Sequence, residues 1–155
     1  MPREIERKFL LTDDSWKADV SRAVGMRQGY LNSAPERTVR VRIAGERAYL
    51  TVKGPVTGIT RPEFEYEIPV AEGLAMMELC EQPVIEKTRF YVDVAPHTWE
   101  IDVFSGDNEG LVVAEIELHS EGEDFVREAW LGAEVSGDKR YYNSGLVRKP
   151  YLSWP

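Results

Sequence analysis

The chain has 155 residues, 43% of them hydrophobic and 30% charged, and its formal net charge is −8 at pH 7. This length is typical of one domain that buries a core without disulfides, so we expect a single domain over residues 1–155. The negative charge argues against a general nucleic-acid-binding protein, because such proteins meet phosphates with clustered lysine and arginine. No apolar run is long enough for a membrane span and no signal-peptide pattern opens the chain, so we expect a cytoplasmic protein without a membrane or nucleic-acid partner.

Alternation with a period of two dominates the sequence, as expected for strands, whose successive side chains point to opposite faces. The segments that show it are 4–10, 27–31, 38–43, 48–53, 63–68, 87–94, 98–104 and 111–118. Glycine, proline and asparagine separate most of these segments, as in Gly54-Pro55, and are typical of turns and loops. The spacing predicts eight antiparallel strands, which can close into a barrel without exposed edges.

Three segments have a helical pattern instead. A helix capped by Asp13 or Asp14 is expected to run to Val24, a second to span 72–81, and a third to span about 138–146. Helices of this length can pack against the outside of a barrel. The predicted fold is therefore α+β but mainly β, a closed eight-stranded antiparallel β-barrel with a few peripheral helices.

The predicted strands are unusual because most of them carry charged residues on one face and apolar residues on the other. The charged stripes are Glu4, Glu6 and Lys8; Arg40 and Arg42; Glu63, Glu65 and Glu67; Lys87 and Arg89; Glu100 and Asp102; and Glu115 and Glu117. One interpretation is a barrel with an apolar interior whose charges face water, since charged residues are seldom buried unless they are paired. The other is a barrel whose charges face a closed lumen.

Like charges at successive positions of one face favour the lumen. Arg40 with Arg42, and Lys87 with Arg89, are such pairs. Two like charges about 5 Å apart repel by roughly 3 kcal/mol at an effective dielectric constant near 20, so they need an opposite charge or a bound anion nearby. The pattern by itself leaves both interpretations open.

If the stripes converge, their bases can bind an extended polyanion such as a triphosphate, with arginine binding in bidentate fashion and lysine acting as a point charge. The acidic pairs Glu4 with Glu6 and Glu115 with Glu117 supply hard oxygen ligands, which suit Mg²⁺ or Mn²⁺. Such a set fits phosphoanhydride hydrolysis, which needs mainly positioning and charge neutralisation. A further hypothesis is that Lys87 or Lys53, held among other cations, has a lowered pKa and assists proton transfer.

The residues resemble a known superfamily, the CYTH domains or triphosphate tunnel metalloenzymes. Its hallmark Glu-x-Glu-x-Lys is present as Glu4-Ile5-Glu6-Arg7-Lys8. Matching segments follow in order at 28–31, 40–42, 51–54, 61–65, 87–90, 99–104, 114–117, 130–132 and 140–146. Because these segments cover nearly the whole chain, the resemblance favours the lumen interpretation and implies a closed eight-stranded tunnel.

The resemblance also implies roles for individual residues. The phosphate-binding bases would be Lys8, Arg40, Arg42, Lys53, Lys87 and Arg89. The metal-side acids would be Glu4, Glu6, Asp102, Glu115 and Glu117. We expect catalytic roles for Lys8, Lys53, Lys87, Glu63 and Glu65. How the last two divide between metal support and structure stays open.

Family resemblance does not fix the substrate. A short chain without an added helical domain is most similar to the inorganic triphosphatases, so we expect hydrolysis of tripolyphosphate to pyrophosphate and phosphate with Mg²⁺ or Mn²⁺. The alternatives are a class IV adenylate cyclase, another nucleoside or thiamine triphosphatase, or a noncatalytic polyphosphate-binding module. The sequence leaves a homodimer open.

Overall fold

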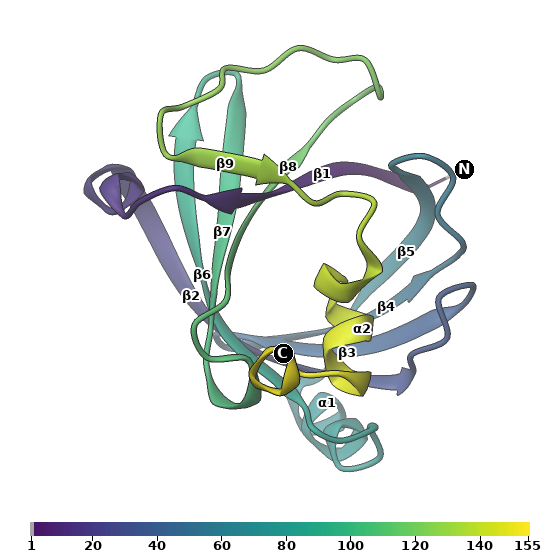
Figure 1. The fold of residues 1–155 in the computed structure, drawn as a ribbon. Helices are drawn as coiled ribbons and strands as arrows, with labels where there is room; N and C mark the ends of the chain where they lie inside the picture. The colour runs from purple at the N-terminus through teal and green to yellow at the C-terminus, as the bar shows by residue number, and fades with distance from the viewer. Residues whose placement is uncertain (1) are drawn as a thin grey trace.

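The computed structural model describes residues 2–155 and has eight antiparallel strands that close into a barrel (Figure 1). The strands are β1 (Arg3–Leu11), β2 (Val20–Asn32), β3 (Thr38–Ala44), β4 (Arg47–Lys53), β5 (Thr60–Ile68), β6 (Ile85–Val94), β7 (His97–Phe104) and β8 (Val112–Glu117). Their order is β5-β4-β3-β2-β6-β7-β8-β1, and pairing of β1 with β5 closes the ring. The predicted mainly β fold and its closed eight-stranded barrel are confirmed.

The first strand is shared between two neighbours on one side. Its start, Arg3–Ile5, pairs with β5, whereas Phe9 and Leu11 pair with an extra strand, β9 (Leu131–Glu134). The sequence analysis did not predict β9, because four residues are too few for a clear alternation. The extra strand covers the part of β1 that β5 leaves unpaired.

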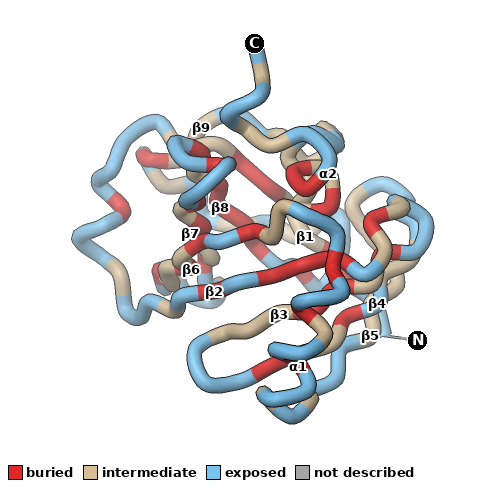
Figure 2. The backbone as a smooth tube through the Cα atoms, turned by 90° about the horizontal axis from the view of Figure 1, so that it is seen from below, coloured by how far each residue is buried: buried red, intermediate tan, exposed pale blue. Residues whose placement is uncertain are grey.

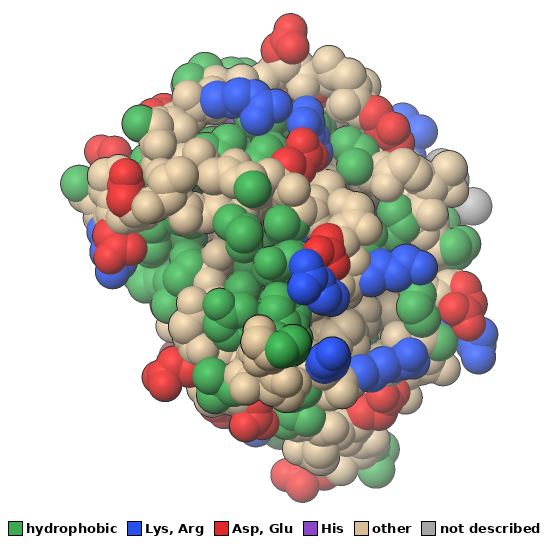
Figure 3. Space-filling model, in the orientation of Figure 1, with side chains coloured by type: hydrophobic (Ala, Val, Ile, Leu, Met, Phe, Trp, Pro, Cys, Tyr) green, Lys and Arg blue, Asp and Glu red, His purple; other side chains and the backbone are tan. Residues whose placement is uncertain are grey.

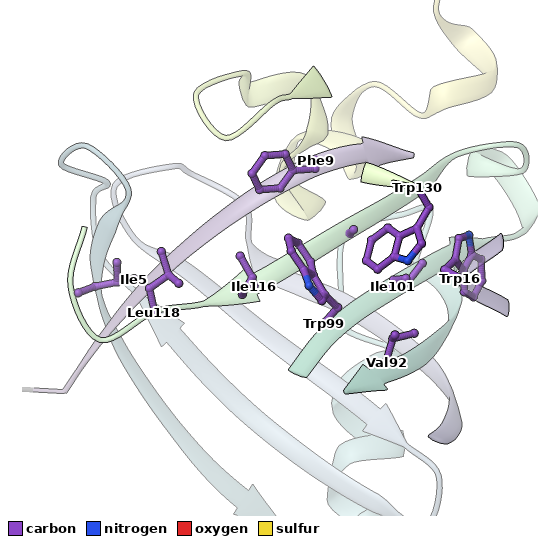
Figure 4. Packing of buried hydrophobic residues seen from close by; sticks show 10 residues of the cluster. Ile5, Phe9, Trp16, Val92, Trp99, Ile101, Ile116, Leu118 and Trp130 are labelled. Carbon is purple, nitrogen blue, oxygen red and sulfur yellow. The ribbon is translucent and has the colours of Figure 1, made fainter. Parts of the chain in front are cut away.

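The apolar core lies outside the barrel and not in its lumen. In the pairing of β1 with β8, Lys8 lies opposite Glu115 on the lumen face, and Phe9 lies opposite Ala114 on the outer face. The largest cluster of buried apolar residues covers the outer face of β1, β6, β7 and β8 (Figure 4). It includes Ile5, Phe9, Trp16, Val92, Trp99, Ile101, Ile116, Leu118 and Trp130. The 3-10 helix Ser15–Asp19 and the chain after β8 supply the cover, with Trp16 and Trp130 as their contributions.

A second apolar layer joins the helix α1 (Val70–Met77) to the outer face of β3. There Val41, Met77 and Cys80 are buried together, so the single cysteine is part of this layer. The close approach requires Gly29 on β2, because a Cβ atom there would lie 2.7 Å from the Cβ atom of Cys80. Figure 2 shows the buried residues running along the strands while most loops and the C terminus are exposed.

The C-terminal segment lies across one end of the barrel, where α2 (Asn143–Arg148) follows a 3-10 turn, Lys139–Tyr141. Leu146 and Val147 pack in a third cluster with Ile85, Phe104 and other residues of the barrel end. The space-filling view from the same direction shows this end covered by side chains (Figure 3). The C-terminal segment therefore borders the lumen at this end of the barrel.

Two helix predictions need correction. The predicted helix from Asp13 or Asp14 to Val24 is wrong beyond Asp19, because β2 already begins at Val20 and pairs with β6 from there. Cross-strand pairing with a distant segment overrode the local pattern. The predicted helix at 138–146 is interrupted at Tyr142, whose backbone is extended. The helix predicted over 72–81 is present as α1, but it ends at Met77, four residues earlier than predicted. Within residues 2–155, no helix combines the length and apolar character that a membrane crossing needs.

Candidate active site

The lumen holds a cavity of about 200 Å³ whose wall is mostly polar or charged. Every site residue predicted from the sequence lines this cavity except Asp102, which lies behind the bases. The predicted residues in the wall are Glu4, Glu6, Lys8, Arg40, Arg42, Lys53, Glu63, Glu65, Lys87, Arg89, Glu115 and Glu117. Side chains of the C-terminal segment, Ser136 and Tyr142 to Ser144, complete the wall.

The charged stripes are buried, so the interpretation in which they face water is wrong. Lys87 is 3% exposed, and Lys8 and Glu115 are each 6% exposed. Three acids at the edge of the lumen, Glu65, Glu67 and Glu117, are exposed, and of these Glu67 lies at the end of its stripe and pairs with Arg47. The alternation of the strands thus directs one ionic face inward and one apolar face outward.

Asp102 anchors two of the bases and is itself fully buried. Its carboxylate accepts a hydrogen bond of 2.7 Å from Lys87 Nζ, and bonds of 2.8 and 3.0 Å from Arg89 Nε and Nη2. Burial alone would raise the pKa of Asp102, but the charges of Arg89 and Lys87 lower it. Both oxygens of this carboxylate are therefore occupied by bases, which leaves it poorly placed to bind a metal ion as well.

The pKa of Lys87 is lowered by burial and by the cations around it. Burial, together with the nearby charges of Arg89 and Arg42, lowers its pKa to about 7 despite the opposing effect of Asp102. The ammonium group therefore exchanges its proton readily near neutral pH. This agrees with the hypothesis that Lys87 has a lowered pKa.

Arg40 and Arg42 have hydrogen-bonding capacity that the protein does not use. Arg40 Nη2 donates to Thr51 and Glu65, but its buried Nε has no partner. Arg42 pairs with no carboxylate among residues 2–155, and burial with the charges of Arg40 and Arg89 lowers its pKa to about 10. Buried donors without partners are costly, so this side of the lumen is suited to bind an anion.

Three of the acids converge in the lumen. Carboxylate oxygens of Glu4, Glu63 and Glu117 lie within 4.8 Å of one another. Burial and the charge of Glu4 raise the pKa of Glu63 to about 7, and burial with the charges of Glu100 and Glu4 raises that of Glu117. Three hard oxygen donors that repel one another in this way fit a divalent cation.

A lysine of β4 balances part of this negative charge. Lys53 Nζ donates to both carboxylate oxygens of Glu4 at 3.0 Å and lies 3.4 Å from Glu63 Oε2. The pKa of Glu4, which burial would raise, is lowered by Lys53. Lys53 thus pairs directly with two members of the acidic group.

Glu6 and Glu115 lie between the two sides of the lumen. Lys8 Nζ is 3.5 Å from Glu115 Oε1, and Lys8, Arg89 and Lys87 together hold the pKa of Glu115 well below its usual range although burial opposes this. Burial, with the charges of Glu115 and Glu4, raises the pKa of Glu6 well above its usual range. Neither belongs to the group of three carboxylates that come closest together.

Sequence reasoning missed the uncharged residues of the lumen. Gln28 and Thr51 are completely buried, and Asn143 from α2 reaches the cavity wall. The signal used was alternation of charge, which cannot find neutral side chains. The position of Gln28 on the lumen face of β2 could have been found from its period-two spacing with Met26 and Tyr30.

A model of the CYTH domain matches residues 2–144, and the chain belongs to this family. An inorganic triphosphatase of Acetivibrio thermocellus is 51% identical over 155 residues, which are 99% of each chain. An inorganic triphosphatase of Nitrosomonas europaea is 35% identical over 148 residues, or 93% of this chain and 96% of that one. A crystal structure of an inorganic triphosphatase has a TM-score of 0.67 at 34% identity, covering 100% of this chain and 98% of that one. The resemblance to CYTH domains is confirmed, and the family implies a divalent metal.

Proposed function

We propose that this protein is an enzyme that hydrolyses inorganic triphosphate to pyrophosphate and phosphate inside the barrel. The observation that carries the proposal is one lumen cavity lined both by bases with unused donors and by three converging carboxylates. A linear triphosphate carries several negative charges in a row, and it can meet the bases directly and the carboxylates through a cation. The full-length relatives named inorganic triphosphatases support the same substrate.

The acidic group fits a divalent cation, and we propose Mg²⁺ or Mn²⁺. Glu4, Glu63 and Glu117 would hold it, with Glu6 and Glu115 close by. These metals take oxygen ligands and keep several waters, so a few carboxylates suffice. When bound, the ion would supply charge neutralisation on the phosphate oxygens and activation of a water.

The bases position the substrate in this proposal. Arg40, Arg42 and Arg89 bind phosphate oxygens, and Lys8 and Lys53 offset negative charge along the chain of phosphates. We assign Asp102 to holding Lys87 and Arg89 in place, because both of its oxygens are used by them. The low dielectric constant of the closed lumen strengthens each of these interactions relative to water.

Proton movement is assigned to Lys87. With a pKa of about 7, its Nζ can protonate the oxygen of the departing pyrophosphate as the P–O bond breaks. The attacking water forms the new P–O bond as the bond to pyrophosphate breaks, and it releases its proton to solvent. Lys87 then regains a proton from solvent, and the products are phosphate and pyrophosphate.

We also propose that the substrate is a free small molecule and that the protein has no nucleic-acid or membrane partner. The bases line a lumen cavity of about 200 Å³, which a folded nucleic acid cannot enter. As expected from the sequence, we further propose a cytoplasmic enzyme with one domain.

The test is a substrate panel with purified protein and Mg²⁺ or Mn²⁺. Phosphate release from triphosphate should greatly exceed release from ATP, thiamine triphosphate or pyrophosphate. Preference for ATP with formation of cyclic AMP would replace the proposal with a cyclase, and preference for another triphosphate with the corresponding phosphatase. Binding without turnover in either metal would indicate a noncatalytic binding module.

A further inference from the structure

Arg42 is oriented by a neutral amide and not by an acid. Each of the other five predicted phosphate-binding bases has a carboxylate partner, but Arg42 has none in the described chain. Its Nε donates a hydrogen bond of 2.9 Å to Gln28 Oε1. Gln28 lies directly opposite Arg42 in the pairing of β2 with β3 and is completely buried.

The amide of Gln28 is held in turn by the C-terminal segment. Gln28 Nε2 donates a hydrogen bond of 2.7 Å to Asn143 Oδ1, and the same oxygen accepts one of 3.0 Å from Lys87 Nζ. A buried amide bound at both ends has a fixed orientation. This series of hydrogen bonds, from Arg42 through Gln28 and Asn143 to Lys87, therefore connects strands β3, β2 and β6 with the first residue of α2.

A neutral partner has a consequence for an anion-binding base. A carboxylate would compete with phosphate for the guanidinium, whereas an amide oxygen orients Nε without cancelling the charge. The two Nη groups of Arg42 make no hydrogen bond to the described protein and stay available to the lumen. The hydrogen-bonded side-chain amides of Gln28 and Asn143 thus orient the Nη groups of Arg42 toward the cavity.

We propose that Gln28 and Asn143 are positioning residues of the triphosphate site, which orient Arg42 and Lys87 and make the C-terminal segment part of that site. The inference rests on the proposed function. Neither residue is assigned to the reacting atoms, since both act through the two bases. A second contact of the same segment, from Lys8 Nζ to the Tyr141 carbonyl oxygen at 3.1 Å, supports its place in the site.

The first test is a double-mutant cycle on triphosphate binding, measured by calorimetry in EDTA so that no turnover occurs. Gln28→Met keeps the length of the side chain and removes both hydrogen bonds, so it should weaken binding about tenfold or more, as expected for a bond to a charged group. In an Arg42→Met background the same change should have less than about a twofold effect, because its target is gone. Additive effects in the double variant would overturn the proposal.

A matched control is Met26→Leu, on the same strand and also buried, which should leave triphosphate affinity unchanged. Equal weakening by Met26→Leu and Gln28→Met would point to general packing and would overturn the positioning role. Asn143 is only half-buried, so Asn143→Leu tests the same link without replacing a fully buried residue.

The second test needs no substrate. Amide hydrogen exchange of residues 143–148 should become at least about fivefold faster in Asn143→Leu, whereas Asn143→Asp, which keeps an oxygen acceptor, should retain the protection. Unchanged exchange in Asn143→Leu would overturn the link to the C-terminal segment. If the unmodified protein bound no triphosphate, the proposed function would fail, and this exchange result would still decide whether the hydrogen-bonded side-chain amides hold the segment.

Discussion

The converging carboxylates make metal binding dependent on pH, and Glu63 is the group that sets this dependence. Two carboxylates within 4.8 Å of each other repel by roughly 3.5 kcal/mol at an effective dielectric constant near 20. Burial and this repulsion from Glu4 raise the pKa of Glu63 from its ordinary value of 4.5 to about 7. Below pH 7 a cation must therefore displace a proton from Glu63.

Metal affinity should therefore rise with pH. At pH 6 Glu63 is about nine-tenths protonated, so the affinity for Mn²⁺ should rise about tenfold from pH 5 to 6 and level off above pH 7. Isothermal titration calorimetry without substrate measures the Mn²⁺ affinity at each pH. In Glu63→Gln this rise should become shallower, because Glu117 still has a raised pKa, while in Glu65→Gln, on the same strand face but outside the carboxylate group, it should persist unchanged. Equal Mn²⁺ affinity at pH 6 and 8, or an unchanged slope in Glu63→Gln, would refute the reasoning.

Four further substitutions test the division between outer core and inner site. Ile101→Ala removes a fully buried outer residue and should lower the unfolding free energy by about 2–5 kcal/mol in denaturant titrations; a loss below about 1 kcal/mol would contradict the outer core. Glu117→Gln should abolish metal-dependent phosphate release without lowering the melting temperature, and full activity would remove the metal assignment. Arg40→Ala should raise KM for triphosphate more than it lowers kcat, and an unchanged KM would exclude its binding role. Gly29→Ala should reduce stability by about 1–3 kcal/mol through its clash with Cys80, and an unchanged melting temperature would show that α1 moves freely.

Local sequence determined the strands and the identity of the charged lumen residues. Period-two alternation assigns Glu4, Glu6 and Lys8 to one face of β1 whatever the rest of the chain does, and the same holds for Arg40 with Arg42 on β3. Alternation cannot say which face is inside, because an ionic stripe can meet water or another ionic stripe. The resemblance to CYTH domains favoured the lumen, and the buried charges agree with it.

Where local signals were weak or misleading, long-range contacts decided the structure. Residues after Val20 look helical, but pairing with β6 makes them a strand, since a backbone in a ladder gains partners that a short isolated helix lacks. The four residues of β9 become a strand because they complete the pairing of β1.

The sequence by itself determined which side chains face the same way along each strand, because that depends only on backbone geometry. The tertiary structure alone decided which of them meet. Glu4, Glu63 and Glu117 come from three strands, and Asn143 reaches Gln28 across 115 positions of the chain. Such contacts depend on barrel closure and on the course of the C-terminal segment, which no local pattern encodes.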